Sequence, residues 1–372
     1  MTLARPWNGA RTLLANSPPL RLTFWVVVVG AAVIVTLIAL GVARHFRDVR
    51  AERRREHVQK ELQPLFSRFL QTEDATQLAE ELRPAFLRMD AAHRPVAAWL
   101  TIDVMREASL SQKAQLRREL ELAGIVELGE RGTRRLSPWR RALACEALGE
   151  IGADRSVPCL LDRLEDRRPE VRFSAVRALG FIGSREAVPA LSKAFLERRV
   201  APTNVVNNAL RRIGGAAAPA FERGIISDDP IVRVSSCFGF SGIAEEHGLA
   251  VVRLADVLAT DSDSQVRAAA ASALGIVGGT NAPRQLIDAT TDSNVHVRRS
   301  AVKALASFDD PTTGDALLER AEDEDRETAI RAAEALFALA RRPRAAAQAR
   351  THLERCPGWS VEYARKVAEV TA

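Results

Sequence analysis

The sequence predicts an all-α protein in which one transmembrane helix precedes a right-handed α-solenoid of helical hairpins. Three observations predict this class. A long uncharged stretch lies near the N-terminus, a short pattern recurs at intervals of about 31 residues, and the apolar residues of that pattern have helical spacing.

The excess of positive charge is confined to the N-terminal end. The formal net charge is +6, and residues 1–60 alone carry ten basic and three acidic side chains, so the rest of the chain is nearly neutral. A nucleic acid requires basic residues along the surface that binds it. We therefore expect no nucleic-acid partner.

The uncharged stretch is residues 22–43, LTFWVVVVGAAVIVTLIALGVA. As a helix it would span about 33 Å, enough for the ~30 Å hydrocarbon core of a bilayer. A cleaved signal peptide is the alternative, because LGVA at 40–43 resembles a cleavage site. Since the apolar run is longer than a signal sequence needs, we predict a retained anchor with residues 1–21 as a tail.

The charges that flank this helix predict its orientation. Three arginines precede it, whereas seven basic residues follow it within 44–60. Because the more basic flank stays in the cytoplasm, we expect the C-terminal part on the cytoplasmic side of a bacterial inner membrane. Residues 44–60 form either a basic juxtamembrane helix against anionic headgroups or a solvated linker.

The recurring pattern contains an Ala-Leu pair, with a degenerate Gly-Phe pair in the one gap. The pairs begin at Ala147, Ala178, Ala209, Gly239, Ala273, Ala304 and Ala335. Steps of 30 to 34 residues indicate a solenoid, because a unit of this size can bury its apolar face only against its neighbours.

The first half of each unit is predicted to be a helix. In PEVRFSAVRALGFIG, residues 169–183, apolar side chains fall at positions i, i+4, i+7 and i+11 and form one stripe. The stripe consists of Val171, Ala175, Ala178 and Ile182. Its small residues suit a close approach of neighbouring helices.

Glycine and proline mark the ends of the predicted helices. In four units a glycine follows the stripe, where a left-handed residue ends a helix at little conformational cost. These glycines are Gly152, Gly183, Gly214 and Gly278. Pro158 and Pro189 stand where a second helix would begin. The unit is therefore predicted to be a helix, a tight turn and a second helix.

A polar pattern also repeats, in which a short polar residue stands six positions before an arginine. The pairs are Asp166 and Arg172, Ser227 and Arg233, Asp261 and Arg267, and Asp292 and Arg298. An acid just ahead of a helix is suited to N-capping, and the arginine could reach the acid of the adjoining repeat. A row of ligand-binding charges is the alternative, but strict recurrence favours a structural ladder.

These residues resemble a known family. The spacing Asp-x5-Arg, followed by AVRALGFIG and AVPAL, is similar to the HEAT-like repeats of bacteria, in particular the short type also found in phycobilin lyases. The resemblance covers residues 137–358 in seven units, and we assign 137–372 to the solenoid of HEAT-like hairpins. In the third unit, Pro202 and Thr203 replace the Val-Arg of the pattern.

Residues 61–136 are predicted to be degenerate helix pairs that cap the repeats, since they lack a clean period. The segment 124–152 resembles the start of the repeats in bacterial membrane-anchored HEAT-like proteins. Some of those proteins are associated with membrane glycosyltransferases that make exported polysaccharide. The resemblance therefore implies a partner of that class.

No catalytic constellation stands out. The six histidines are spread singly, and the His-Glu pairs that bind iron in the HEAT-like deoxyhypusine hydroxylases are missing. His247, after Glu245 and Glu246, is interpreted as part of a solvated loop. Phosphate-binding and nucleophile motifs are absent, and four scattered cysteines indicate buried thiols in a reducing compartment. We expect no enzyme activity, no metal and no cofactor.

A solenoid offers a long concave face lined by its second helices. The positions two after a buried Leu or Phe on these helices are charged, namely Asp162, Lys193, Arg223, Asp256, Asp288 and Glu319. A face of both signs fits a protein or peptide, although any helix surface of so charged a protein would look similar. We therefore predict a membrane-anchored scaffold that binds and organises a protein partner. The alternatives are an enzyme subunit acting on a cofactor or lipid-linked substrate, and a purely structural module.

Overall fold

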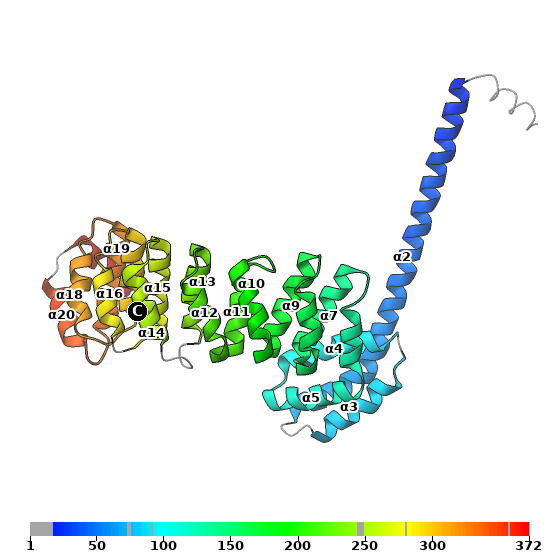
Figure 1. Cartoon of the computed structure of the whole chain (residues 1–372), viewed down its shortest axis with the longest axis horizontal. Helices are drawn as coiled ribbons and strands as arrows, with labels where there is room; N and C mark the ends of the chain where they lie inside the picture. Colours follow the sequence, from blue (N-terminus) through cyan, green and yellow to red (C-terminus); the bar gives the residue numbers. More distant parts are fainter. Residues whose placement is uncertain are drawn as a thin grey trace, which may run out of the picture. The chain divides into compact units, whose positions relative to one another are not determined.

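The structure, a computed structural model, contains only helices as regular elements in the part of the chain that it describes (Figure 1). Its description of the backbone covers residues 18–72, 76–90, 92–243, 249–279, 281–355 and 358–371. The predicted all-α class is confirmed for these ranges. The chain forms two compact units, Met1–Val104 and Met105–Ala372.

In the first unit, one long helix carries both the apolar stretch and the basic segment. Helix α2 (Pro18–Gln71) runs for 54 residues. The predicted boundaries at residues 21, 43 and 60 all fall inside it. The helix continues because the arginines, glutamates and lysine of 44–60 are strong helix formers.

The apolar stretch of α2 is exposed over its described length. All side chains from Trp25 to Val42 are exposed, and the most apolar window of the helix has a mean hydropathy of 2.9 with no residue buried. By length and composition, this helix is able to cross a membrane. Most of the predicted N-terminal tail lies outside the described residues.

The C-terminal part of α2 packs against α3 (Thr76–Arg88), and α4 (Arg94–Glu107) follows. One face of α2 is apolar here, with buried side chains at helical spacing. These side chains are Val58, Leu62, Phe66 and Phe69. This end of α2 is therefore part of a folded core, in contrast to its exposed first half.

The second unit is a stack of helical hairpins (Figure 1). The hairpins are α5 (Leu110–Leu122) with α6 (Ile125–Gly132), α7 (Pro138–Ile151) with α8 (Val157–Arg163), α9 (Pro169–Ile182) with α10 (Val188–Glu197), α11 (Thr203–Ile213) with α12 (Ala218–Ile225), α13 (Pro230–Ser241) with α14 (Ala250–Thr260), α15 (Ser264–Val277) with α16 (Ala282–Ala289), α17 (Val295–Leu305) with α18 (Thr313–Arg320), and α19 (Arg326–Leu339) with α20 (Ala346–Arg355). Helix α21 (Trp359–Thr371) ends the stack. The first turns of α8, α10 and α12 contain Pro158, Pro189 and Pro219.

Each first helix packs on the first helix of the next hairpin, from α7 through α9, α11, α13, α15, α17 and α19 to α21. Second helices also contact one another, as α10 does with α12 and as α14, α16, α18 and α20 do in succession. Helices that pack on those of adjacent hairpins form the α-solenoid that the period predicts. The hairpin of α5 and α6 joins the stack ahead of α7, although its sequence shows no period.

The predicted apolar stripe lies between the first helices. Val171, Ala175 and Ala178 are at most 1% exposed, whereas Ile182 at the end of α9 is half-buried. Small residues let the helices approach closely. A Cβ atom added to Gly180 would lie only 2.6 Å from Cα of Ala209 on α11, so this position has no room for a side chain.

Glycines end the first helices in two ways. Gly152 and Gly183 take the predicted left-handed conformation, with φ of 72° and 75°. Gly214 and Gly278 have φ of 81° and 75° but ψ of −150°, a region that is essentially restricted to glycine. The glycines after α11 and α15 therefore have a different ψ from those after α7 and α9.

Candidate protein-binding surface

The six predicted partner-binding residues lie on six successive second helices, α8, α10, α12, α14, α16 and α18. They are Asp162, Lys193, Arg223, Asp256, Asp288 and Glu319, and all six are exposed. Because they occupy equivalent positions on helices that follow one another through the stack, we treat them as one surface feature. We call these six residues the second-helix row.

Most of this row has no partner within the described chain. No hydrogen bond or ion pair joins the side chains of Asp162, Lys193, Asp256 or Asp288 to another described residue. The remaining two residues are engaged locally, since Nη2 of Arg223 donates to Oγ of Ser192 at 2.8 Å and Glu319 lies 3.7 Å from Arg320. Four of the six charges are therefore free to meet a ligand.

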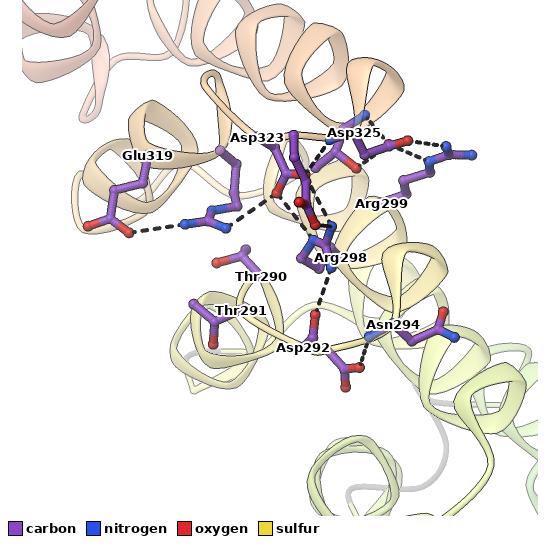
Figure 2. Close-up of polar contacts among 12 residues, drawn as sticks. Thr290, Thr291, Asp292, Asn294, Arg298, Arg299, Glu319, Asp323 and Asp325 are labelled. Carbon is purple, nitrogen blue, oxygen red and sulfur yellow. Dashed lines mark hydrogen bonds and ion pairs between the residues drawn. The ribbon is translucent and has the colours of Figure 1, made fainter.

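Arginines of the repeating polar pattern reach the acid of the next repeat. In four pairs, Nε and Nη2 donate to the two carboxylate oxygens of one aspartate, at 2.8 to 3.2 Å. The pairs are Arg141 with Asp166, Arg233 with Asp261, Arg267 with Asp292, and Arg298 with Asp323, the last of which is drawn in Figure 2. We call these four pairs the arginine ladder. Bidentate pairing fixes the relative orientation of the two groups as well as their distance.

Ladder arginines also hold the loop before their own helix. Nη1 of Arg267 donates to the carbonyl of Asp261 at 2.9 Å, and Nη1 of Arg233 donates to that of Ser227 at 2.8 Å. One guanidinium therefore joins two consecutive loops. This double role explains why the polar residue and the arginine recur six positions apart.

The ladder acids close turns rather than cap helices, which corrects the predicted N-cap role. Oδ1 of Asp261 accepts a hydrogen bond from the N–H of Asp263 at 2.9 Å, and Asp263 is the residue that caps α15. Asp292 and Asn294 repeat this arrangement before α17 (Figure 2). Before α15 and α17, the loop thus carries two short polar residues, of which the first closes an Asx turn and the second caps the helix.

Two ladder arginines favour the ionised form of their aspartates, Asp292 and Asp166. Hydrogen bonds from Arg267 hold the pKa of Asp292 below its ordinary value, although partial burial opposes them. At Asp166, burial acts to raise the pKa, but hydrogen bonds from Arg141 and from the N–H of Arg168 outweigh it, so that the pKa is lowered. The carboxylates of Asp166 and Asp292 are therefore charged at neutral pH and neutralised by Arg141 and Arg267.

The ladder is interrupted at the third repeat. Arg172 has the position of a ladder arginine, but within the described residues its guanidinium meets only carbonyl groups, with Nε 2.9 Å from Val200 O and Nη1 3.0 Å from Asp166 O. Val200 stands two residues before Pro202, the N-cap of α11, as Asp261 does before the N-cap of α15. A valine therefore replaces the acid that the ladder predicts for Arg172.

Helix α11 also begins late. The repeat spacing aligns Thr203 with Arg172. Arg172 is the fourth residue of α9, whereas Thr203 is the first residue of α11. Residues 198–202 do not form the first turn and instead form a loop, which starts at Arg198 in the left-handed conformation with a φ of 54°. The sequence signal for this difference is the replacement of Val-Arg by Pro202 and Thr203.

A groove of about 1160 Å³ lies beside this loop. It is lined by the N-terminal parts of α7, α9 and α13 and by residues 198–204. Two large apolar side chains in its lining, Trp139 and Ile231, are 72% and 50% exposed. We call this feature the third-repeat groove. It was not predicted from the sequence.

Histidines, cysteines and acids do not gather into a metal-binding group among the described residues. His247 and its two neighbouring glutamates lie outside those residues, as does Cys356. Burial raises the pKa of the Cys145 and Cys237 thiols to about 12. Both thiols are therefore protonated at neutral pH and unsuited to nucleophilic attack.

Comparison with known families supports the repeat architecture. The family model described as HEAT repeats matches residues 127–211, 251–340 and 283–366, which together make up more than half of the chain. The interval between the first two matches contains α12 and α13. No protein among those with curated descriptions matches this chain.

Three solved structures resemble the chain weakly. An engineered protein is 19% identical, with 79% of this chain and 82% of that one covered and a TM-score of 0.34. The complex of CpcE and CpcF of phycocyanin lyase from Nostoc sp. PCC7120 is 22% identical, with 70% and 94% covered and a TM-score of 0.32. Human deoxyhypusine hydroxylase in complex with glycerol is 21% identical, with 79% and 95% covered and a TM-score of 0.28. At this level of similarity none of them carries an argument about function.

Proposed function

Since the chain belongs to the HEAT-repeat family, we propose that it is a scaffold whose repeats bind another protein at a membrane surface. The observation that carries the proposal is the second-helix row. Its six charged side chains are exposed on successive helices, and four of them have no partner in the described chain. Charges that the fold does not use are available for recognition of a complementary surface.

The order of charges along the row defines the chemistry of the partner. Lys193 and Arg223 lie on α10 and α12, between Asp162 on α8 and the acids of α14, α16 and α18. A complementary partner would present acidic groups to α10 and α12, and basic groups to α8 on one side of them and to the three later helices on the other. Such a division of charge favours one orientation of the bound protein over the reverse.

We also propose that α2 anchors this scaffold in a bilayer. The apolar side chains from Trp25 to Val42 form a larger continuous apolar surface than soluble proteins normally expose to water. The basic residues of 44–60 follow directly, and the positive-inside rule then places the repeats in the cytoplasm of a bacterium. A membrane glycosyltransferase of a polysaccharide-export system is one candidate partner, by the sequence resemblance alone.

Affinity capture from membranes with the full-length chain tests the protein-binding role. The double variant Lys193→Glu with Asp288→Lys reverses two charges of the row and preserves the net charge. Its matched control, Lys303→Glu with Glu186→Lys, reverses two exposed charges outside the row. We expect the row variant to lose the captured protein and the control to retain it. Equal capture by both variants would show the proposal to be wrong.

Two further measurements test the rest of the proposal. A reporter that is active only in the periplasm, fused after Ala372, should be inactive, and its activity would reverse the proposed orientation. The proposal assigns no catalytic step to the chain. A stoichiometric metal or organic cofactor in the purified protein, found by elemental analysis and mass spectrometry, would favour the role of an enzyme subunit instead.

A further inference from the structure

Arg172 is a ladder arginine whose carboxylate is missing. Each of its four counterparts donates two hydrogen bonds to an aspartate. Arg172 is half-buried and meets backbone carbonyls instead, the closest being those of Val200 at 2.9 Å and Asp166 at 3.0 Å. A carbonyl can accept from an N–H but does not neutralise the charge of a guanidinium. The junction between α9 and the third repeat therefore holds a cation that no described carboxylate of this chain neutralises.

The other charges around the third-repeat groove do not compensate for this cation. The ionisable side chains in its lining are Arg168, Arg172, Arg198, Arg199, Glu146 and Glu170. Arg198 is paired with Asp229 at 2.5 Å, and Glu146 lies 3.6 Å from Arg177. Among the described residues, the other three arginines of the lining have no carboxylate partner. The groove therefore attracts an anionic group.

The groove also offers apolar surface next to these charges. Trp139 on α7 and Ile231 on α13 are 72% and 50% exposed, and Phe173 on α9 also lines the groove. Exposed aromatic and aliphatic side chains in a concave site favour an occupant with a bulky apolar group. A volume of about 1160 Å³ has room for several residues of a peptide.

We infer that the third-repeat groove binds an acidic peptide segment of the partner protein. An Asp or Glu of that segment pairs with Arg172 and completes the ladder where Val200 leaves it without an acid. A neighbouring bulky apolar side chain of the segment packs against Trp139 and Ile231. The inference rests on the proposed function, because it identifies one part of the partner that the scaffold binds.

A nucleic acid fits the same groove less well. A nucleic acid would bring several successive phosphate groups near the two glutamates of the lining, whereas the peptide needs only one carboxylate, beside Arg172. The chain beyond residue 60 is nearly neutral, so it lacks the extended basic surface along which a phosphate backbone would lie. Apolar walls add nothing to the binding of a phosphate. The combination of cation, acid and apolar surface therefore favours a peptide.

The substitution Val200→Asp tests the inference by supplying the missing acid from within the chain. Its carboxylate would pair with Arg172 and exclude the carboxylate of a ligand. The matched control Val200→Asn has nearly the same shape without the charge. The melting temperature of each variant, measured alongside, should be no lower than that of the unchanged chain, so a loss of binding would not reflect unfolding.

The probe is a displayed library of short random peptides, selected on the full-length protein in nanodiscs. We expect the selected peptides to be enriched in Asp or Glu beside Trp, Phe, Leu or Ile. Measured by fluorescence anisotropy, their affinity should fall roughly tenfold or more for Val200→Asp and stay unchanged for Val200→Asn. Selection of basic or uncharged peptides, equal affinity for the two variants, or equally tight binding of a single-stranded oligonucleotide would each overturn the inference.

Capture of the membrane partner separates this inference from the proposed function. Val200→Asp and the row variant Lys193→Glu with Asp288→Lys are compared in the same experiment. If Val200→Asp captures the partner as well as the unchanged chain does while the row variant does not, the groove inference fails and the proposed function stands. If neither change reduces capture, both fail.

Discussion

Two parts of the repeat array use the same arginine differently. From α13 to α19, three consecutive ladder arginines each pair with an aspartate of the next repeat, whereas the arginine between α9 and α11 has no acid to meet. In the first region, an aspartate of the next repeat neutralises the charge of each arginine, and the pair holds the two repeats together. In the second region, no aspartate neutralises the charge of the arginine, so it is available to a ligand. A ladder arginine therefore has a purely structural role only where the next repeat supplies its aspartate.

Removal of an arginine from the intact region should have the largest effect. Arg233→Ala leaves Asp261, whose side chain is 9% exposed, without its bidentate partner. We expect the free energy of unfolding to fall by about 3 kcal/mol, measured by urea unfolding followed by far-UV circular dichroism.

The same change at the interrupted position is the control. Arg172→Ala removes hydrogen bonds to carbonyl groups but leaves no carboxylate unpaired, so it should lower the free energy of unfolding by about 1 kcal/mol. Equal losses for Arg172→Ala and Arg233→Ala would contradict the difference between the two regions.

The stability of the junction between α9 and α11, which lacks a ladder pair, should depend strongly on helix packing. In Gly180→Ala the new Cβ would lie 2.6 Å from Cα of Ala209, so α9 and α11 must move apart. We expect a loss of about 2 kcal/mol in the free energy of unfolding. Asn208→Ala, at an exposed position of α11, should change it by less than about 0.5 kcal/mol. A stable Gly180→Ala variant would show that the close approach is not required.

Val200→Asp should give the interrupted region the ion pair that the intact region has. A new pair with Arg172 is expected to raise the free energy of unfolding by about 1 kcal/mol and the melting temperature by about 3 °C. Differential scanning calorimetry measures this shift, and Val200→Asn should not show it. An unchanged or lowered melting temperature for Val200→Asp would mean that position 200 is not equivalent to the ladder acids.

The pH dependence of stability should reveal a smaller difference. Hydrogen bonds from Arg267 lower the pKa of Asp292 in the folded chain, so this pair contributes stability above the unfolded pKa near 3.9. That contribution is lost as the pH falls through the lower, folded pKa. Asp292→Asn should therefore show a flatter loss of stability below about pH 4 in urea titrations. A profile parallel to that of the unchanged chain would contradict the role of this pair.

The repeat unit could be predicted because it follows local rules. The spacing of Val171, Ala175 and Ala178 requires a helix with one apolar face, and the glycine after that face ends the helix. The hairpin of α5 and α6 follows the same packing without a recognisable period, so only the structure shows it as part of the stack.

The third-repeat groove could not be predicted, because it depends on the path of a loop. The residue six positions after Val200 is not an arginine, so the sequence pattern does not identify Val200 as a ladder position. Its equivalence to Asp261 becomes clear only from the structure, in which each of the two residues stands two positions before the N-cap of its helix, α11 or α15. The sequence indicated a departure only through Pro202 and Thr203. Exposure of the second-helix row follows from the helical period, whereas its role in binding stays a prediction.

The uninterrupted course of α2 has a mechanical consequence. With residues 22–43 in the bilayer, as proposed, residues 44–71 would extend about 42 Å as one helix. A continuous helix transmits rotation as well as length, since each added residue turns its far end by about 100°. Insertion of about seven residues adds roughly two full turns, so the C-terminal end of α2 would face the same way relative to a bilayer-embedded partner. Insertion of about five residues would turn that end to a different side.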